Sequence, residues 1–304
     1  MIKSKTLKKG DCIGIVAPAS PTPEEDVIRS KEALEKLGFE VKVGQSCYGR
    51  YGYLSGNDDL RAGDINRMFG DKNIDGIMCI RGGYGTPRIL EKIDYSCIRK
   101  NPKVFIGYSD ITAIHIALNQ ICRLITFHGP MASTDMIKDF DDFTRESLMD
   151  SIMYEDIVEE VKNPCGHEIQ TLVKGCAEGL LVGGNLSLIA ATIGTPYEID
   201  TRGKILFIED IDEEPYSIDR MLTQLSLSSK LDEASGFILG DWNNCIAKSY
   251  NPSLTLTEVL DDLIVPLNKP TICNIRAGHC KPMVTLQLGR KISIDGNRGK
   301  IMLK

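Results

Sequence analysis

The stretch VFIGYSDITAIHIALN, residues 104–119, gives the clearest indication of the fold. An apolar run, 104–106, stops at Gly-Tyr-Ser-Asp, 107–110, and an amphipathic segment, 111–119, follows. This order is typical of a strand, a tight turn and a helix. Such a turn lifts a serine hydroxyl clear of the sheet and places the next N–H groups at a helix N-terminus, where negative charge is stabilised. Ser109 is therefore a candidate nucleophile, although the same residues could equally serve to cap the helix.

Short β-rich runs alternate with helix-like segments through the first half of the chain. The predicted strands are 12–17, 41–43, 76–80 and 104–106, and the predicted helices are 24–37, 58–69 and 111–119. This alternation predicts βαβ units and a mainly parallel, open sheet. Ligands bind beyond the carboxyl ends of the strands in such a sheet, and Ser109 follows one of those ends.

The second half of the chain lacks the regular alternation of strands and helices. Residues 139–174 are acidic and poor in β-formers, which predicts a helix and a connector. Strands at 204–208, 236–239 and 285–288, with one helix at 218–226, predict a smaller mixed domain that is richer in β structure, with a sheet that could be closed or partly closed. We expect an α/β N-terminal domain over 1–155, and the connector with the C-terminal domain over 156–304.

Composition excludes several classes of protein. With 304 residues, 42% of them hydrophobic, the chain suits two globular domains. Its net charge of −6 and the lack of a basic cluster argue against nucleic acid as a partner. We find neither a signal-peptide core nor an apolar run long enough for a membrane helix, and expect a cytoplasmic protein without a membrane partner. Cys273, His279 and Cys280 lie close in sequence but lack paired Cys-x-x-Cys spacing, so no metal is expected.

A serine nucleophile needs a base, usually histidine, and the chain has only four. His115 lies within the helix that follows the serine and is expected to be structural, and His167 lies in the connector. His279 is in a loop bounded by Gly and Pro, where a side chain can reach a cleft. The layout favours it only slightly over His128, which follows a strand-like run.

An acid that orients the base and donors for an oxyanion complete such a site. Glu209 directly follows the buried-type run 205–208 and could accept a bond from an imidazole, although it also begins an acidic loop. The Asp110 N–H, next to the serine, is one candidate oxyanion donor, and the glycine-rich segment 81–85 could supply a second. A phosphate-binding loop is the rival interpretation of those glycines, but neither phosphate-loop motif is present.

Eight segments together resemble the LD-carboxypeptidases. They are RGGYGTP at 81–87, FIGYSDIT at 105–112, TFHGPM at 126–131, GGNL at 183–186, GTP at 194–196, FIED at 207–210, YSIDRML at 216–222 and GHCKP at 278–282. These serine peptidases include the murein tetrapeptide carboxypeptidases and the microcin C self-immunity peptidases. The resemblance spans nearly the whole chain, in the family's order.

The resemblance implies a two-domain cytoplasmic enzyme, commonly a homodimer, that needs no cofactor. The matching positions make Ser109 the nucleophile, Glu209 the orienting acid and His279 the base. The family's oxyanion hole maps onto the N–H groups of Gly83 and Asp110.

The expected reaction is hydrolysis of an amide bond between an L-configured centre and a C-terminal D-amino acid, with release of D-alanine from muropeptides, as in peptidoglycan recycling. Arg81 and Asn185, and also Arg220, are candidates for binding this small peptide substrate, although such residues often serve structure instead. Two alternatives remain: a peptidase that detoxifies an aminoacyl-nucleotide antibiotic, and a non-catalytic receptor for a small ligand.

Overall fold

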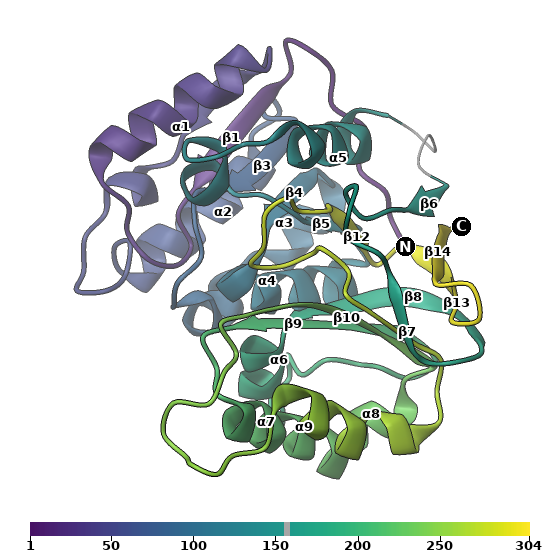
Figure 1. Cartoon of the computed structure of the whole chain (residues 1–304). Coiled ribbons are helices and arrows are strands. Elements are labelled where there is room, and N and C mark those ends of the chain that lie inside the picture. Colours follow the sequence, from purple (N-terminus) through teal and green to yellow (C-terminus); the bar gives the residue numbers. More distant parts are fainter. Residues whose placement is uncertain (155–158) are drawn as a thin grey trace. The chain divides into compact units, whose positions relative to one another are not determined.

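The computed structural model describes residues 1–154 and 159–304, which form two compact units (Figure 1). Unit 1 contains the residues up to 154 together with Thr285–Gly289, and unit 2 contains 159–284 and 290–304. The boundary expected between residues 155 and 156 lies outside the described residues. The fold class predicted from the sequence, α/β with a more β-rich second part, is confirmed.

Unit 1 is built on a six-stranded sheet in the order β12-β5-β4-β3-β1-β2. The pairs from β2 to β5 are all parallel, as the βαβ alternation predicts. The strands are β1 (Cys12–Val16), β2 (Glu40–Val43), β3 (Gly76–Cys79), β4 (Val104–Gly107), β5 (Thr126–His128) and β12 (Leu286–Leu288). The chain reverses its direction of travel across the sheet after β2, so the topological switch point lies between the neighbours β1 and β3, where open α/β sheets bind ligands.

The helices of unit 1 cover this sheet. They are α1 (Glu24–Lys36), α2 (Asp58–Gly70), α3 (Tyr95–Lys100), α4 (Thr112–Ala117) and α5 (Asp142–Met153), with shorter turns η1 (Gln45–Tyr48), η2 (Thr86–Lys92), η3 (Ser109–Ile111), η4 (Leu118–Cys122) and η5 (Ala132–Met136). One core cluster joins the strands to α1, η5 and α5, with Ile15, Leu34 and Leu148 among its members. Burial of these aliphatic faces is the main stabilising term for the unit.

Strand β12 is the main departure from the predicted organisation. Residues 285–288 were expected in the C-terminal domain, yet β12 pairs antiparallel with β5 at the edge of the first sheet. The Asn119 amide nitrogen also donates to the Leu288 carbonyl oxygen at 3.4 Å. The chain therefore returns to unit 1 near its end, and this part of the prediction is wrong.

Unit 2 holds an eight-stranded, curled half-barrel sheet in the order β6-β14-β13-β8-β9-β10-β11-β7. Its strands are β6 (Glu160–Val161), β7 (Gln170–Val173), β8 (Cys176–Asn185), β9 (Ile205–Ile211), β10 (Gly236–Asn243), β11 (Thr271–Cys273), β13 (Lys291–Asp295) and β14 (Lys300–Leu303). The middle strands, β8 to β11, are parallel and the outer pairs are antiparallel. The expected connector thus supplies two edge strands, β6 and β7, as well as the helix α5.

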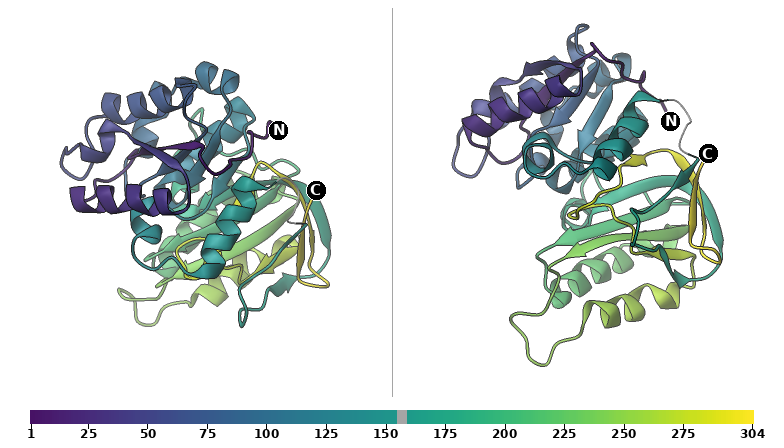
Figure 2. Two further views of the ribbon diagram at one scale, coloured as in Figure 1. Left: turned by 90° about the horizontal axis from the view of Figure 1, so that it is seen from above. Right: turned by 45° about the horizontal axis from the view of Figure 1, so that its top comes forward.

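The helices of unit 2 gather along one face of its sheet (Figures 1 and 2). They are α6 (Leu186–Thr192), α7 (Pro215–Leu227), α8 (Lys230–Glu233) and α9 (Leu256–Leu263), followed by a short turn, η6 (Val265–Leu267). The sequence predicted one helix in this part of the chain, 218–226, which corresponds to α7. The prediction of a single helix is wrong, because α6, α8 and α9 are also present. Since adjacent side chains of a strand point to opposite faces, residues of β9 alternate between the helix-covered face and the other one.

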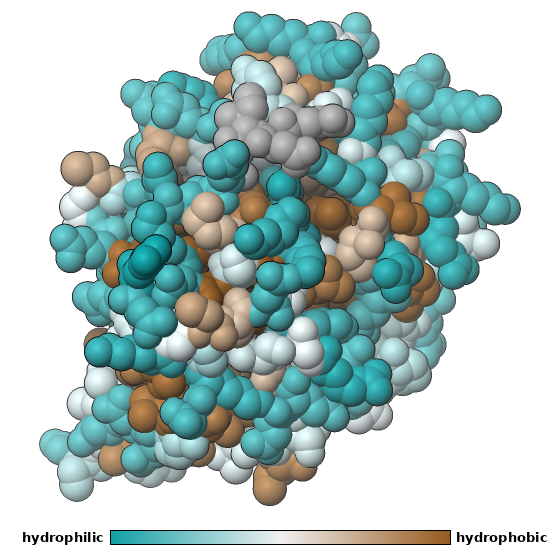
Figure 3. Space-filling model, turned by 90° about the vertical axis from the view of Figure 1, so that its right-hand side faces the viewer, coloured by the Kyte–Doolittle hydropathy of each residue, from teal (hydrophilic) through white to brown (hydrophobic). Residues whose placement is uncertain are grey.

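Hydrophilic side chains cover most of the face shown in Figure 3, with hydrophobic ones in small groups between them. Among the described residues, no helix has the length and apolar character needed to cross a membrane.

Candidate active site

The turn after β4 holds Ser109 in an unusual backbone conformation. Its φ of +64° is left-handed, a region that residues other than glycine rarely adopt. The preceding Gly107 is closely packed, because a Cβ there would lie 3.0 Å from two Ile111 carbons. Ser109 is partly exposed, whereas Tyr108 and Asp110 on either side are buried. The strand, bend and helix predicted from the sequence are therefore confirmed, and the strain is of the kind that clusters at functional sites.

The glycine-rich segment 81–85 follows β3, the strand beside β4, and its backbone lies against the serine. A Cβ on Gly82 would come within 2.8 Å of the Ser109 Cβ and 3.0 Å of its Oγ, so the segment can approach this closely only because that side chain is missing. Gly83 has a φ of +117°, and a Cβ there would overlap Ser20. Unit 1 thus brings together Ser109, Asp110 and the segment that contains Gly83.

Asp110 joins the two turns. Its Oδ2 accepts a hydrogen bond from the Thr86 N–H at 2.8 Å, and its backbone carbonyl accepts one from the Thr86 hydroxyl. Burial raises the pKa of the Asp110 carboxyl, and the bonds from Thr86 oppose that rise. The sequence predicts a role only for the backbone N–H of Asp110, as an oxyanion donor. The hydrogen bond that its carboxyl group accepts from the other turn was not predicted.

Glu209 and His279 meet within unit 2. Glu209 is the fifth residue of β9 and is fully buried, and its Oε2 accepts a hydrogen bond from Nδ1 of His279 at 2.7 Å. His279 lies in the loop before β12 and keeps 13% of its side chain exposed. Gly278 makes the approach feasible, because a Cβ there would lie 2.5 Å from Oε2 of Glu209. The carboxylate fixes the ring so that Nε2 carries the lone pair, as a general base requires.

The loop that carries His279 is tied down on both sides. Arg276 forms an ion pair with Asp241 at 2.8 Å and donates to the Lys281 carbonyl oxygen at 2.7 Å, which bridges the loop. The side-chain amide of Asn243, the last residue of β10, donates to the His279 carbonyl oxygen at 2.6 Å. Desolvation raises the pKa of Asp241, and the Arg276 charge opposes the rise. These contacts limit the positions that the imidazole can take.

Asn185, a candidate substrate-binding residue, makes structural contacts. Its Oδ1 accepts from the Leu188 N–H and caps α6, while its Nδ2 donates to Asp210 at 2.8 Å. Asp210 also accepts bonds from the Ser187 N–H and hydroxyl, on the helix-covered face opposite Glu209. The role of Asp210 was missed from the sequence, although its place beside Glu209 at the end of a buried run is a signal for an acid that bonds to a helix N-terminus. A substrate contact for Asn185 remains a prediction.

The two candidate arginines differ in their surroundings. Arg81 begins the glycine-rich segment and is half-buried, and it donates to the Pro21 carbonyl oxygen at 3.2 Å. Arg220 lies on α7, where it donates to the Ser217 hydroxyl and stacks over the Tyr216 ring. Of the two, only Arg81 belongs to the unit that contains Ser109.

Both histidines of unit 1, His115 and His128, are buried. His115 donates from Nε2 to the Gly107 carbonyl oxygen at 2.8 Å, which confirms the structural role expected for it. Burial lowers the pKa of His115 to about 4. His128, the runner-up base, is fully buried at the end of β5, and its ring packs against that of Tyr108.

The buried His115 predicts a specific acid sensitivity. Because its pKa is about 4 in the folded protein and near 6.5 otherwise, the unfolded chain binds a proton that the folded one excludes. Stability should therefore fall as pH is lowered from about 6.5 to 4, by up to about 3 kcal/mol. Denaturant unfolding measured across this range should show the loss in the wild type. His115→Gln keeps a hydrogen-bond donor but cannot titrate, so its free energy of unfolding should lack this pH-dependent loss. If the free energy of unfolding falls equally steeply with pH in the variant and the wild type, His115 is not the cause.

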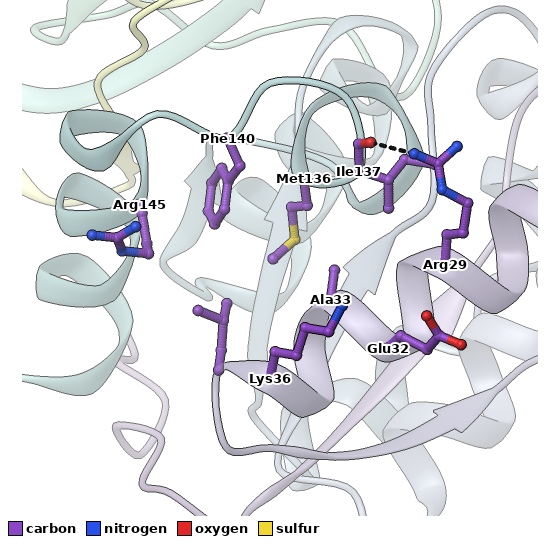
Figure 4. A pocket seen from close by; sticks show the side chains of 9 residues that line it. Arg29, Glu32, Ala33, Lys36, Met136, Ile137, Phe140 and Arg145 are labelled. Carbon is purple, nitrogen blue, oxygen red and sulfur yellow. Dashed lines mark hydrogen bonds between the residues drawn. The ribbon is translucent and has the colours of Figure 1, made fainter.

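The described residues contain no group of three or more His, Cys, Asp or Glu placed to hold a metal ion. A pocket of about 350 Å³ lies elsewhere in unit 1, between α1 and the segment that leads to α5 (Figure 4). Arg29, Lys36 and Arg145 surround its apolar floor, and Arg29 is already bonded to the Ile137 carbonyl oxygen.

Comparisons with known proteins identify the family of the chain. Residues 13–129 match the model of the LD-carboxypeptidase N-terminal domain, and residues 178–294 match that of the C-terminal domain. The probable murein peptide carboxypeptidase of Bacillus subtilis is 46% identical, over 96% of this chain and 91% of that protein.

Solved structures are similar over nearly their full length. The muramoyltetrapeptide carboxypeptidase from Oxalobacter formigenes is 31% identical with a TM-score of 0.84, covering 96% of this chain and 97% of that one. MccF in complex with glutamyl sulfamoyl guanosine is 26% identical with a TM-score of 0.89, covering 99% and 98%. Sequence and fold therefore agree: the chain belongs to the LD-carboxypeptidase family.

Proposed function

We propose that the protein is a serine carboxypeptidase that hydrolyses the amide bond between an L-configured centre and a C-terminal D-amino acid, releasing D-alanine from muropeptides. The observation that carries the proposal is the 2.7 Å bond between His279 Nδ1 and the buried Glu209, which prepares an imidazole for base catalysis. Membership of the family and the similarity to a probable murein peptide carboxypeptidase support the substrate class.

In the proposed mechanism, Ser109, Glu209 and His279 act as a triad. The hydroxyl oxygen of Ser109 attacks the carbonyl carbon of the scissile amide bond, and Nε2 of His279 accepts the hydroxyl proton. Glu209 stabilises the imidazolium that forms. The same nitrogen then protonates the leaving amine. Water, deprotonated in turn by His279, hydrolyses the acyl-enzyme and restores the serine. No cofactor or metal takes part in these steps.

The oxyanion formed in each half-reaction needs donors that are already in place. We assign this role to the N–H groups of Asp110 and Gly83, since the bend and the glycine-rich segment are packed against each other at Ser109. A donor of this kind typically lowers the barrier by about 3 kcal/mol. Arg81 and Asn185 are proposed to contact the peptide substrate. Arg81 is the stronger candidate, because it begins the glycine-rich segment that lies against Ser109 and its side chain bonds to a backbone carbonyl oxygen, that of Pro21.

The direct test is incubation of the protein with a murein tetrapeptide, followed by mass spectrometry. We expect loss of one alanine from the C-terminus and no cleavage of an all-L control peptide, because the reaction is selective for the D-configured end. Release from both peptides, or from neither, would contradict the proposed specificity.

A second candidate substrate class comes from the similarity to MccF, whose structure holds glutamyl sulfamoyl guanosine. A peptidase that cleaves an aminoacyl-nucleotide would use the same nucleophile and base, so only the substrate would differ. Competition between the tetrapeptide and such a nucleotide analogue separates the two. A receptor without catalysis would differ from both, since it would not react with a serine-directed phosphonate.

The family resemblance further supports a homodimer that acts in the cytoplasm, in the recycling of peptidoglycan. Both points are proposals, as is the absence of nucleic acid and of a membrane among its partners.

A further inference from the structure

Arg61, on α2, is one of the largest fully buried side chains described, with 0% exposure. A guanidinium taken out of water needs partners for its charge and its N–H groups. Nη2 is paired with Asp58, and Nη1 donates to two backbone carbonyl oxygens, those of Pro18 and of Gly85, the latter at 2.9 Å. The two carbonyls belong to separate loops, so this one side chain ties the loops to each other.

Those two carbonyls belong to the segments that surround Ser109. Pro18 lies in the segment after β1, which also carries Ser20. The Ser20 N–H donates to the Gly82 carbonyl oxygen at 3.4 Å, and its hydroxyl accepts from the Tyr84 N–H at 3.2 Å. Gly85 ends the glycine-rich segment itself. Arg61 therefore joins both segments at the switch point between β1 and β3.

The peptide group between Gly85 and Thr86 is held at both of its polar ends. Its carbonyl oxygen accepts from Arg61, and its N–H donates to the Asp110 carboxyl, one residue beyond the serine. Gly85 has a φ of +134°, and a Cβ there would lie 2.7 Å from Nη1 of Arg61. With both ends fixed, the plane of this peptide cannot rotate, and the segment leading back to Gly83 starts from a set direction.

We propose that Arg61 is a positioning residue for the peptidase: by holding the Gly85 carbonyl it fixes the glycine-rich segment so that the Gly83 N–H is aimed at the oxyanion beside Ser109. This inference rests on the proposed function. It explains why a buried cation is directed at a loop carbonyl, since a displacement of about 1 Å in such a donor can cost roughly a hundredfold in rate.

Arg88 provides a matched control. Its Nη2 lies 3.0 Å from Asp58, the acid that also pairs with Arg61, but its side chain is 40% exposed and forms no bond to Pro18 or Gly85 among the described contacts. Only its backbone N–H donates to the Gly85 carbonyl oxygen, at 3.3 Å, and a side-chain substitution keeps that bond. Replacing Arg88 removes an arginine from the same ion-pair cluster. The hydrogen bonds of Arg61 and Asp110 with the Gly85–Thr86 peptide group stay in place.

The experiment compares Arg61→Met, Arg61→Lys and Arg88→Met with the wild type. The readouts are kcat and KM for the tetrapeptide, the rate at which a fluorophosphonate labels Ser109, and the melting temperature. For Arg61→Met we expect kcat to fall about 100-fold with KM within about threefold, and labelling to slow in parallel. Arg61→Lys should lose about tenfold, because an ammonium cannot reproduce the guanidinium fork. Arg88→Met should keep the wild-type kcat.

A purely structural role predicts a different result: a lower melting temperature with wild-type kcat per labelled site in Arg61→Met, which would overturn the proposal. If that variant does not fold, Arg61→Lys decides, and wild-type kcat in it overturns the proposal equally. A wild type that labels but releases no alanine refutes the substrate, and the labelling rates still test Arg61. A wild type that does neither refutes both proposals.

Discussion

Replacing Ser109 with alanine is expected to abolish turnover while leaving the protein folded. Removal of the nucleophile in a serine peptidase costs about 10⁵- to 10⁶-fold in kcat, because only the oxyanion donors and substrate binding remain. The serine residue is partly exposed, and its hydroxyl forms no hydrogen bond that fixes the bend among the residues that the structure describes. Circular dichroism and the melting temperature should therefore stay near those of the wild type. Alanine release by mass spectrometry and phosphonate labelling provide the measurements.

Ser229→Ala is a suitable control for this variant. Ser229 also has a left-handed backbone, with a φ of +62°, but it is exposed and lies in unit 2, at the start of α8. Both variants therefore place alanine in a left-handed backbone conformation, with a similar conformational strain. Only Ser109→Ala should lose activity. Appreciable turnover in Ser109→Ala would show that another group is the nucleophile.

Glu209→Gln is expected to lower kcat by about 10³- to 10⁴-fold with little change in KM. Glutamine keeps the volume of the buried side chain, but its amide can offer N–H to Nδ1 of His279 and thereby place the proton on Nε2, the wrong tautomer for a base. The 2.7 Å separation leaves no room for water to intervene. Steady-state kinetics over a range of pH should show the loss throughout, since the defect lies in orientation and charge.

Asp212→Asn tests whether the acidic stretch as a whole matters. Asp212 is exposed, has a φ of +61° that asparagine tolerates, and accepts a bond from Asn244 that an amide oxygen can replace. This variant should retain wild-type kinetics. Equal losses in Glu209→Gln and Asp212→Asn would point to a general electrostatic effect and against an orienting acid.

Much of unit 1 could be predicted because its local signals agree with one another. Apolar runs of strand length end at glycines, amphipathic segments follow, and the bend at Ser109 lies where an α/β sheet presents a site. The same consistency extends to Glu209, a carboxylate placed directly after four buried residues of β9. The loop around His279 favoured it only slightly over His128, which follows a strand-like run, and the family resemblance was needed to choose between them. Sequence spacing does not show which carboxylate lies near each histidine.

Other elements escaped prediction for identifiable reasons. Strands β6 and β7 are short edge strands with no continuous apolar run, so their composition resembles a connector. Helix α9 carried a readable signal, since Thr255 and Glu258 form a capping box before an amphipathic segment. The contacts of Asn185 and Arg61 depend on residues distant in the sequence, and no local pattern indicates them.

The return of β12 to the first sheet has a consequence for how the protein is made. The partner that covers the free side of β5 is residues 286–288, so the amino-terminal unit stays incomplete until the ribosome has synthesised almost the entire chain. Cotranslational folding cannot finish the first unit before the second has emerged, and pairing over such a separation is slow. A truncation that stops before residue 285 would leave β5 as an uncovered edge, which invites aggregation, and neither unit is a simple excisable fragment.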